Sequence, residues 1–338
     1  MRQVLHILKA GVIGVGYFGA LHAEAYHANP LTELVAVADI DIRRASEVAS
    51  KHGAKPYSNF HEMLRHEKLD IVSVATPDDK HTEPAVAAAE AGVNILLEKP
   101  IATDLQEAKK ILSATEKHKV KLMVNFILRF DPRYRRAYEF VSEGGLGEVV
   151  TIWARRSTLL ETAKKYGRFS NLIYDVIIHD IDMCNLFAMS EPKKVYCVSV
   201  GKTQRGAGLE DAYLAIIQYG GGSAASLETS WVLPKTSPHW LDSRFHVIGT
   251  EGAVYVELQS HGLEIVSGKG VYRPDLSNWP IVGGRLTGNL REAINYFVEC
   301  VAKDVPPSPS GEDGFKALEV ASALHKSASS GQLIELGK

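Results

Sequence analysis

The sequence has few cysteines and almost no net charge. Three of its 338 residues are cysteines, Cys184, Cys197 and Cys300. The count is odd, and no two are close enough for a CxxC metal or redox motif. Thiols in apolar surroundings are usually inert and buried. We therefore expect a cytoplasmic protein, in a reducing compartment, that has no structural zinc.

Charge and hydropathy exclude two further classes. Lys and Arg number 38 against 40 Asp and Glu, a formal net charge of −2, which argues against binding nucleic acid or anionic membranes through bulk electrostatics. No stretch approaches the roughly 18 consecutive apolar residues of a membrane span. Residues 1–6 lack the apolar run and cleavage site of a secretory signal. We expect neither a nucleic-acid nor a membrane partner.

Short apolar runs alternate with helical patterns over the first 125 residues. Unbroken apolarity is typical of parallel strands that are covered on both faces. The alternation predicts an α/β fold class, with a doubly wound Rossmann domain at 1–125. Thr103 and Gln106 form a capping-box pattern before the last helix. Expected strands are 9–13, 34–38, 71–75, 93–97 and 121–126; expected helices are 18–27, 42–52, 61–65, 82–91 and 105–117.

The pattern changes after residue 125. Consecutive strands separated by short Gly-rich turns predict a mostly antiparallel sheet. We therefore expect a second, α+β domain at 126–338. Its expected strands are 149–156, 194–200, 212–219, 223–231, 243–248 and 253–258; its expected helices are 132–142, 171–189, 289–303 and 312–329.

A glycine-rich motif follows the first apolar run. Gly14, Gly16 and Gly19 form GxGxxG at a strand–turn–helix junction, and Asp39 ends the next strand 20 residues after Gly19. Such glycines allow a tight turn, close approach of the backbone to a pyrophosphate, and close helix–strand packing, while the acid binds ribose hydroxyls. Because a carboxylate repels a 2′-phosphate, we expect NAD rather than NADP, although Arg44 could hold that phosphate.

Two motifs carry candidate chemistry. Lys99 follows the strand at 93–97, where doubly wound sheets bind ligands, and lowering of its pKa would suit proton transfer; the alternative is a solvated loop lysine. Asp175 and His179 are four apart on an expected helix, so they share a face, and Asp182 follows on the same side. A carboxylate can orient a histidine as an acid or base. The alternatives are a surface pair, a core histidine, or a metal held with Asp182; we expect no metal.

Substrate contacts are expected from Arg129 and from the segment Trp231–Trp240, which supplies two indoles, a lysine and a histidine. Aromatic side chains commonly line carbohydrate sites, and Trp240 is our candidate among them. Aromatic residues are also enriched at interfaces, so a subunit contact is an equal alternative for this segment.

Taken together, these motifs resemble the Gfo/Idh/MocA oxidoreductases, which include glucose–fructose oxidoreductase and inositol 2-dehydrogenase. The resemblance covers nearly the whole chain. It rests on the glycine motif with Tyr17, Phe18 and the following His22, then on Asp39 and on several later segments. These are Ala75-Thr76-Pro77 with His81, Glu98-Lys99-Pro100, Asn125-Phe126 leading to Arg129-Phe130-Asp131, Asp175-xxx-His179-xx-Asp182, and Gly249-Thr250-Glu251-Gly252.

The resemblance implies an NAD-dependent enzyme that oxidises a secondary alcohol of a sugar or polyol, with Lys99, Asp175 and His179 acting together. It also implies that the second domain has a large, open, mostly antiparallel sheet whose bare face packs against another subunit, giving a homodimer or homotetramer. Lys99, Arg129, Asp175, His179 and Trp240 are the substrate-binding candidates. The cofactor-binding candidates are Gly14, Gly16, Tyr17, Phe18, Gly19, Asp39, Ile40, Arg44, Thr76, Pro77, His81, Glu98 and Lys99.

Two other functions remain open. One is a dehydrogenase of a nucleotide-linked sugar such as a UDP-sugar, which would need extra basic groups near the second sheet. The other is a non-catalytic, NAD-sensing regulator of the same fold, although a sensor needs no acid–base set. The basic candidates are Arg155, Arg156, Lys164, Lys165 and Arg168.

Overall fold

The structure is a computed structural model that describes residues 7–167, 171–203 and 208–337. The chain forms two compact units. One extends to Ile127 and includes Asn278–Phe315, and the other contains Leu128–Ser277 and the chain from Lys316. The domain boundary that the sequence places between residues 125 and 126 stays a prediction. Residues 278–315, which the sequence places in the second domain, pack with the first unit.

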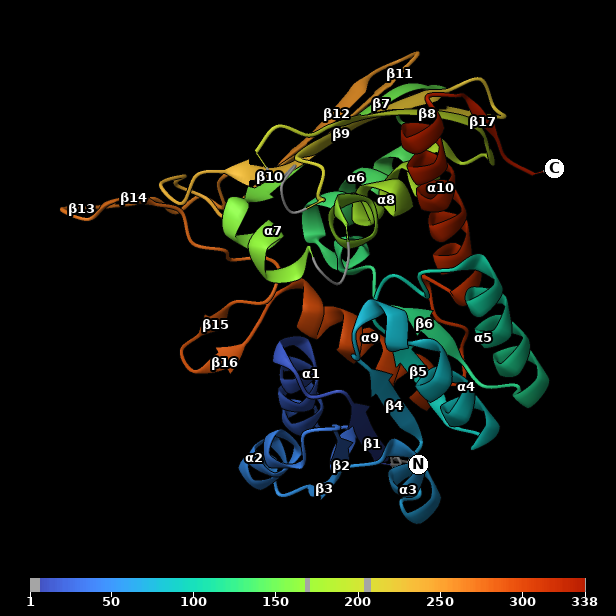
Figure 1. The fold of residues 1–338 in the computed structure, drawn as a ribbon, viewed down its shortest axis with the longest axis vertical. Coiled ribbons are helices and arrows are strands. Elements are labelled where there is room, and N and C mark those ends of the chain that lie inside the picture. The colour runs from blue at the N-terminus through green and yellow to red at the C-terminus, as the bar shows by residue number, and fades with distance from the viewer. Residues whose placement is uncertain (1–6, 168–170, 204–207, 338) are drawn as a thin grey trace. The chain divides into compact units, whose positions relative to one another are not determined.

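The first unit contains a six-stranded parallel sheet in the order β3-β2-β1-β4-β5-β6 (Figure 1). The order reverses between β1 and β4, and ligands of doubly wound sheets bind outside the carboxyl ends of the strands at such a point. Every residue of β4 and β6 is buried, as expected for strands covered on both faces. The strands are β1 (Leu8–Ile13), β2 (Thr32–Ala38), β3 (Lys55–Tyr57), β4 (Ile71–Val74), β5 (Asn94–Leu97) and β6 (Leu122–Val124).

The helices of this unit fall into two groups. Helix α1 packs against α2 and α9, whereas α4 packs against both α3 and α5. The side chain of Asp104, not Thr103, caps α5, accepting hydrogen bonds from the backbone of Gln106 and Glu107. The helices are α1 (Tyr17–Ala28), α2 (Ile42–His52), α3 (Phe60–His66), α4 (Thr82–Glu90), α5 (Leu105–His118) and α9 (Asn289–Ala302), with a short turn η1 (Asp78–Lys80) and a two-stranded ribbon β15 (Ile281–Val282) and β16 (Arg285–Leu286).

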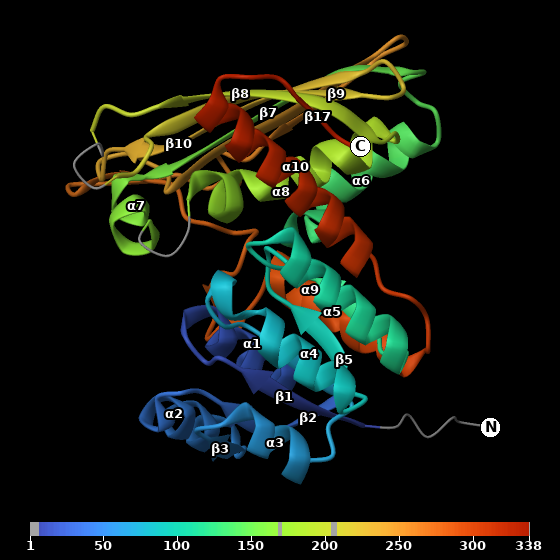
Figure 2. The same ribbon diagram turned by 45° about the vertical axis from the view of Figure 1, so that its right-hand side comes forward.

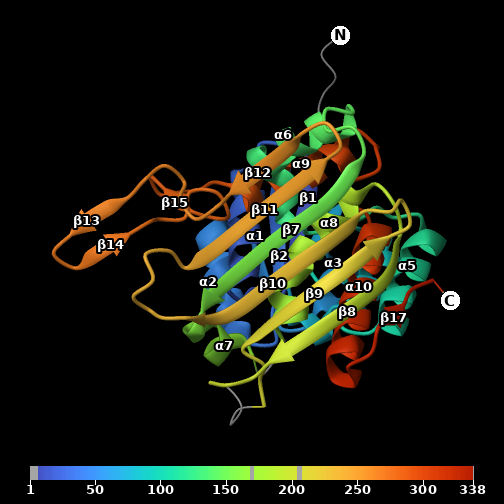
Figure 3. The same cartoon turned by 90° about the horizontal axis from the view of Figure 1, so that it is seen from above.

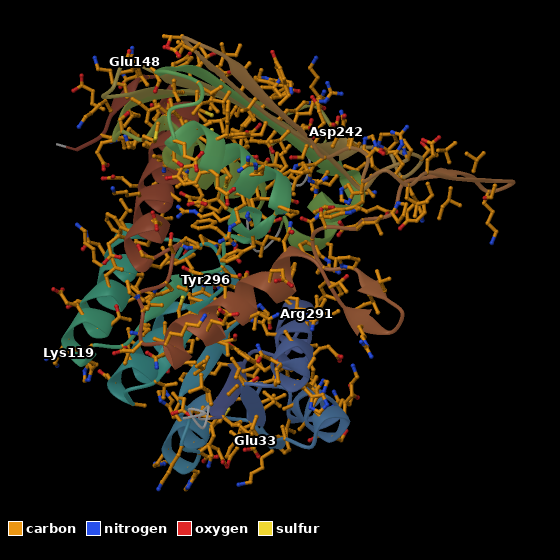
Figure 4. All side chains as sticks on the ribbon, turned by 180° about the vertical axis from the view of Figure 1, so that it is seen from behind. Glu33, Lys119, Glu148, Asp242, Arg291 and Tyr296 are labelled. Atoms are coloured by element: carbon orange, nitrogen blue, oxygen red, sulfur yellow. The ribbon has the colours of Figure 1, made fainter. Side chains whose placement is uncertain are left out.

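The second unit contains a seven-stranded sheet in the order β12-β11-β7-β10-β9-β8-β17. All neighbours are antiparallel except β7 and β10, so the expected mostly antiparallel sheet is confirmed. Glu148, directly before β7, and Asp242, on β11, lie at opposite ends of the sheet along the strand direction (Figure 4). The strands are β7 (Val149–Leu159), β8 (Pro192–Val200), β9 (Ala212–Tyr219), β10 (Ala224–Leu233), β11 (Leu241–Gly249), β12 (Ala253–Glu257) and β17 (Ile334–Glu335).

Helices of the second unit lie on one face of this sheet (Figure 2). The opposite face, seen from above in Figure 3, carries no other element among the unit's described residues. The hairpin of β13 (Ile265–Ser267) and β14 (Gly270–Tyr272) extends away from the sheet. The remaining elements are η2 (Ile127–Phe130), α6 (Pro132–Ser142), α7 (Leu160–Tyr166), η3 (Ile173–Ile177), α8 (Ile178–Ala188) and α10 (Gly311–Ser330), the last beginning in the first unit.

The helix expected at 171–189 has a different geometry in its first part. Residues Ile173–Ile177 form a π-helical turn, and the α-helix starts at Ile178. The side chain of Asn171 accepts hydrogen bonds from the backbone of Ile173 and Tyr174 at the start of this segment. Single π turns are rare and occur often at functional sites. Within the described chain, no helix is both long and apolar enough to span a membrane.

Candidate functional site

The glycine motif lies where β1 leads into α1. Gly14 has a φ of +81°, in the region that favours glycine. Gly19 packs so closely that an added Cβ would lie 1.8 Å from the carbonyl oxygen of Gly14, whereas a Cβ on Gly16 would meet no atom within 4 Å. Gly16 caps α1 without a side chain, which leaves N–H groups of the first turn available to an anion. This open cradle fits the pyrophosphate of a dinucleotide.

Tyr17 and Phe18 form the first turn of α1, directly after the cradle. Tyr17 is mostly exposed. The rings of Phe18 and Trp279 form a T-shaped pair, with ring centroids 5.0 Å apart. Phe18 is therefore held by packing within its own unit, while Tyr17 remains accessible to a ligand.

Asp39 directly follows β2 and is buried. Its Oδ2 accepts a hydrogen bond from the backbone N–H of Val15 at 3.0 Å, and its Oδ1 accepts one from Asp41 at 2.9 Å. Arg44 reaches both oxygens at 3.3 Å. Asp39 thus fixes the glycine loop as well as presenting a carboxylate beside it, and the neighbouring Ile40 is almost fully exposed.

We expect Gly16 and Gly19 to respond differently to substitution by alanine. Gly19→Ala should destabilise the apo protein by about 1–3 kcal/mol, because its methyl group overlaps the Gly14 carbonyl. Gly16→Ala should change stability by less than about 1 kcal/mol but weaken NAD binding at least tenfold, because its methyl group enters the cradle. Urea denaturation and NAD titration measure the two effects, and normal NAD affinity in Gly16→Ala would contradict this assignment.

The loops after β4 and β5 are joined by one buried histidine. His81 contacts the carbonyl oxygen of Thr76 at 3.0 Å through Nε2 and that of Pro100 at 2.7 Å through Nδ1. The hydroxyl of Thr76 donates to the carbonyl of Lys80 at 2.9 Å, and Pro77 precedes η1. His81 therefore holds the Lys99–Pro100 turn in place. The peptide bond between Lys99 and Pro100 is cis.

Glu98 and Lys99 directly follow β5. The Glu98 carboxylate binds the ring of His22 and the amide of Asn125, and accepts a longer hydrogen bond of 3.3 Å from the backbone N–H of Lys99. In the sequence, His22 and Asn125 are marked only by the family motifs. Ser73, which contacts the other ring nitrogen of His22, is not marked by any pattern. A buried serine in an apolar strand gives no signal of such a contact.

Asp175 and His179 both lie in the segment that joins η3 to α8. Asp175 belongs to the π turn and His179 to the first turn of α8. The segment is not one regular α-helix, but residues four apart also lie on nearly the same side of a π turn, so a shared face for Asp175 and His179 stays a prediction. Both residues are partly accessible, and Val176, Ile177 and Ile178 around them are buried.

Asp182 has a structural partner. Arg129, in η2, donates to both of its carboxylate oxygens, at 2.8 Å and 2.6 Å. Both side chains are largely buried. This ion pair anchors α8 to η2 and engages Arg129, which we had expected to contact substrate. No cluster of three or more metal-ligating side chains occurs in the part of the chain that the structure describes.

The structure corrects one sequence prediction for the second unit. Trp231 is not in a binding loop: it is buried in β10, and its indole donates to the carbonyl of Glu210 at 2.7 Å. Two of the five basic candidates lie on opposite faces of the sheet. Arg156 forms a buried pair with Asp180, at 2.6 Å and 3.0 Å, whereas Arg155 points to the other face of β7, as successive strand residues must. Trp240 is half-buried, and Arg168 lies outside the described residues.

Comparisons with known proteins identify the family of the chain. Residues 8–126 match the model of an oxidoreductase family with an NAD-binding Rossmann fold, and residues 134–255 match the Gfo/Idh/MocA C-terminal domain. An inositol 2-dehydrogenase of Rhizobium meliloti is 31% identical, over 97% of this chain and 99% of its own length. The scyllo-inositol 2-dehydrogenase (NAD(+)) of Bacillus subtilis is 29% identical, over 98% and 97%.

The fold is also that of solved structures. A putative myo-inositol dehydrogenase from Sinorhizobium meliloti superposes with a TM-score of 0.84. That protein is 29% identical in sequence, and the match covers 98% of this chain and 100% of the other.

Proposed function

Because the chain belongs to the Gfo/Idh/MocA oxidoreductase family, we propose that it is an NAD-dependent dehydrogenase acting on a secondary alcohol of a polyol, with inositols as the first substrates to test. The observation that carries this proposal is the full-length similarity to an inositol 2-dehydrogenase. The open glycine cradle and the presence of Lys99, Asp175 and His179 support it.

In the proposed reaction, His179 accepts the proton of the substrate hydroxyl, and Asp175 orients the imidazole and stabilises its protonated form. Lys99 donates a hydrogen bond to the same hydroxyl oxygen and stabilises the negative charge that develops there. When bound, NAD supplies the acceptor for the hydride that leaves the alcohol carbon. The cradle of Gly14, Gly16 and Gly19 holds its pyrophosphate.

A substrate panel tests this function. Purified protein with NAD is given inositol isomers, other polyols, aldoses and UDP-sugars, and the absorbance of reduced nicotinamide is followed. We expect reduction with at least one unphosphorylated polyol or sugar. Reduction with UDP-sugars alone would favour the second candidate. NAD binding without reduction on any compound would favour a regulatory protein.

The structure weakens the case for a nucleotide-linked sugar. That function would use Arg155 and Arg156 to bind a diphosphate, but Arg156 is committed to Asp180 in the core. Arg155 lies against Glu228 at 3.4 Å and Asp242 at 3.5 Å on the open face of the sheet. These two arginines therefore supply no joint diphosphate site.

We also propose that the open sheet face binds a second copy of the chain, giving a homodimer or homotetramer. Leu214 and Ile216 on β9 are 49% and 53% exposed, and Tyr196 and Val198 on the adjacent β8 extend the same patch. Contiguous exposed apolar surface of this kind marks interaction sites.

We also propose a cytoplasmic location for the protein. Its three cysteines are free and buried, which supports a reducing compartment.

Ile216→Lys should dissociate the oligomer, because it places a charge in the centre of the apolar patch. Light scattering after gel filtration should report a smaller mass for Ile216→Lys than for the wild type. Val266→Lys, on the exposed β13 hairpin, is the control and should leave the mass unchanged. A monomeric wild type, or an unchanged mass in Ile216→Lys, would contradict this interface.

A further inference from the structure

A continuous chain of hydrogen bonds leads through the first unit to Glu98. The hydroxyl of Tyr26 contacts Ser73 Oγ at 2.8 Å, and Ser73 Oγ contacts Nδ1 of His22 at 2.9 Å. Nε2 of His22 contacts Glu98 Oε1 at 2.9 Å, and Nδ2 of Asn125 donates to the same oxygen at 2.7 Å. Tyr26, His22 and Ser73 are fully buried. The chain draws on α1, β4 and the loops after β5 and β6.

The direction of these bonds follows from the acceptor at their end. An ionised carboxylate only accepts, so Nε2 of His22 must carry a proton and donate to Glu98. In the neutral imidazole Nδ1 then accepts from the hydroxyl of Ser73, whose oxygen accepts from Tyr26. Tyr26, Ser73 and His22 thus each donate one hydrogen bond to the next group in the chain, and the last of these bonds is donated to Glu98.

The charge of Glu98 is maintained by its partners. Burial would raise the pKa of this carboxyl, but the hydrogen bonds from His22 and Asn125 and the charge of Lys99 hold the pKa below its ordinary value. Burial raises the pKa of Tyr26 well above its ordinary value, so its hydroxyl remains a donor. The carboxylate is therefore a fixed anion beside the residue that we assign to the substrate hydroxyl.

We propose that His22 and Glu98 are positioning residues for Lys99: the chain from Tyr26 through Ser73 and His22 holds the Glu98 carboxylate in place, and this carboxylate fixes the Lys99 turn and keeps its amine charged. The inference rests on the proposed role of Lys99. The Glu98 carboxylate accepts from the Lys99 backbone, and the carbonyl of Pro100 is held by His81, so the turn is tied on both sides of Lys99. Mutual attraction of the two charges favours the ammonium as much as the carboxylate.

The test begins on the protein without cofactor or substrate. Competitive acetylation with acetic anhydride across pH, followed by mass spectrometry of the Lys99 peptide, gives the pH midpoint of Lys99 reactivity. Glu98→Gln keeps the side-chain shape and removes the charge, and we expect the midpoint to fall. Glu83→Gln is the matched control: Glu83 pairs with His61 at 3.1 Å on the surface, and its loss should leave the Lys99 midpoint unchanged.

Substitutions of His22 test whether the chain of hydrogen bonds acts on Lys99 through Glu98. His22→Phe removes the donor to Glu98 and should lower both the Lys99 midpoint and kcat, the latter about tenfold or more. His22→Gln retains an N–H donor at the position of Nε2 and should recover most of both. NAD affinity, measured by fluorescence titration, should stay within threefold in each variant.

Two results would overturn the proposal. An unchanged Lys99 midpoint in Glu98→Gln would show that the carboxylate does not act on the amine. A loss of NAD affinity equal to the loss of kcat would make Glu98 a cofactor contact instead. Because acetylation needs no substrate, an altered midpoint in a protein that oxidises no polyol would refute the proposed function and leave the coupling of Glu98 to Lys99 intact.

Discussion

Replacing Lys99 with methionine should lower kcat by roughly 10²–10⁴, a larger factor than any loss of NAD affinity. Methionine fills a similar volume but neither donates a hydrogen bond nor carries charge. The loss should therefore fall on the chemical step, in which negative charge develops on the substrate oxygen. Steady-state kinetics on the substrate identified by the panel, together with NAD titration, measure both quantities. His179→Ala should give a loss of the same order.

The neighbouring Lys80→Met is a suitable control. Lys80 lies in η1, and its exposed amine contacts Asp79 at 3.1 Å, so its removal should change kcat by less than twofold. Near-normal kcat in folded Lys99→Met or His179→Ala would contradict their roles. An equal loss in Lys80→Met would indicate a nonspecific effect of removing positive charge.

The second large effect concerns stability. Arg156→Leu should destabilise the second unit by about 3–5 kcal/mol, because it leaves the Asp180 carboxylate buried without its bidentate partner. The two side chains are almost completely inaccessible to water, so solvent cannot replace the lost contact. Urea denaturation followed by circular dichroism measures the change in the free energy of unfolding.

Two companion variants separate charge from packing. Arg156→Leu combined with Asp180→Leu should recover much of the loss, because neither charge then remains buried. Arg155→Leu alters the adjacent residue of β7 on the open face, where its ion pairs are partly exposed, and should cost less than about 1 kcal/mol. Equal losses in Arg155→Leu and Arg156→Leu would contradict the assignment of Arg156 to a buried pair.

Much of the first unit could be predicted from the sequence because its strands are continuously apolar and its helices have clear ends. Helix α2 has the predicted bounds, from Ile42 to His52, with Asp41 capping its start and Gly53 in the left-handed region at its end. β3 was missed because a three-residue edge strand containing Pro56 has no apolar pattern. Asp104 replaced Thr103 as the α5 cap, a difference of one residue that spacing alone does not resolve.

The contacts that define the sites could not be predicted, because they join distant parts of the chain. Arg129 and Asp182 are 53 residues apart, and His22 and Glu98 are 76 apart. Neither pair produces a local pattern. The π turn was missed for a different reason: the apolar positions of residues 171–183 fit a regular helix, and one wider turn changes which side chains meet without changing composition. The exposed β13 and β14 have no buried face to impose alternation.

Hydride transfer itself is the most direct test of the central claim. An inositol isomer carrying deuterium on each ring carbon, incubated with NAD and the purified protein, should yield reduced nicotinamide that contains one deuterium by mass spectrometry. Lys99→Met should form this product at least a hundredfold more slowly, on the scale expected for loss of a positioned proton-transfer or charge-stabilising group. Saturating NAD binding with no deuterium in the nicotinamide, for any polyol or sugar of the panel, would contradict the account.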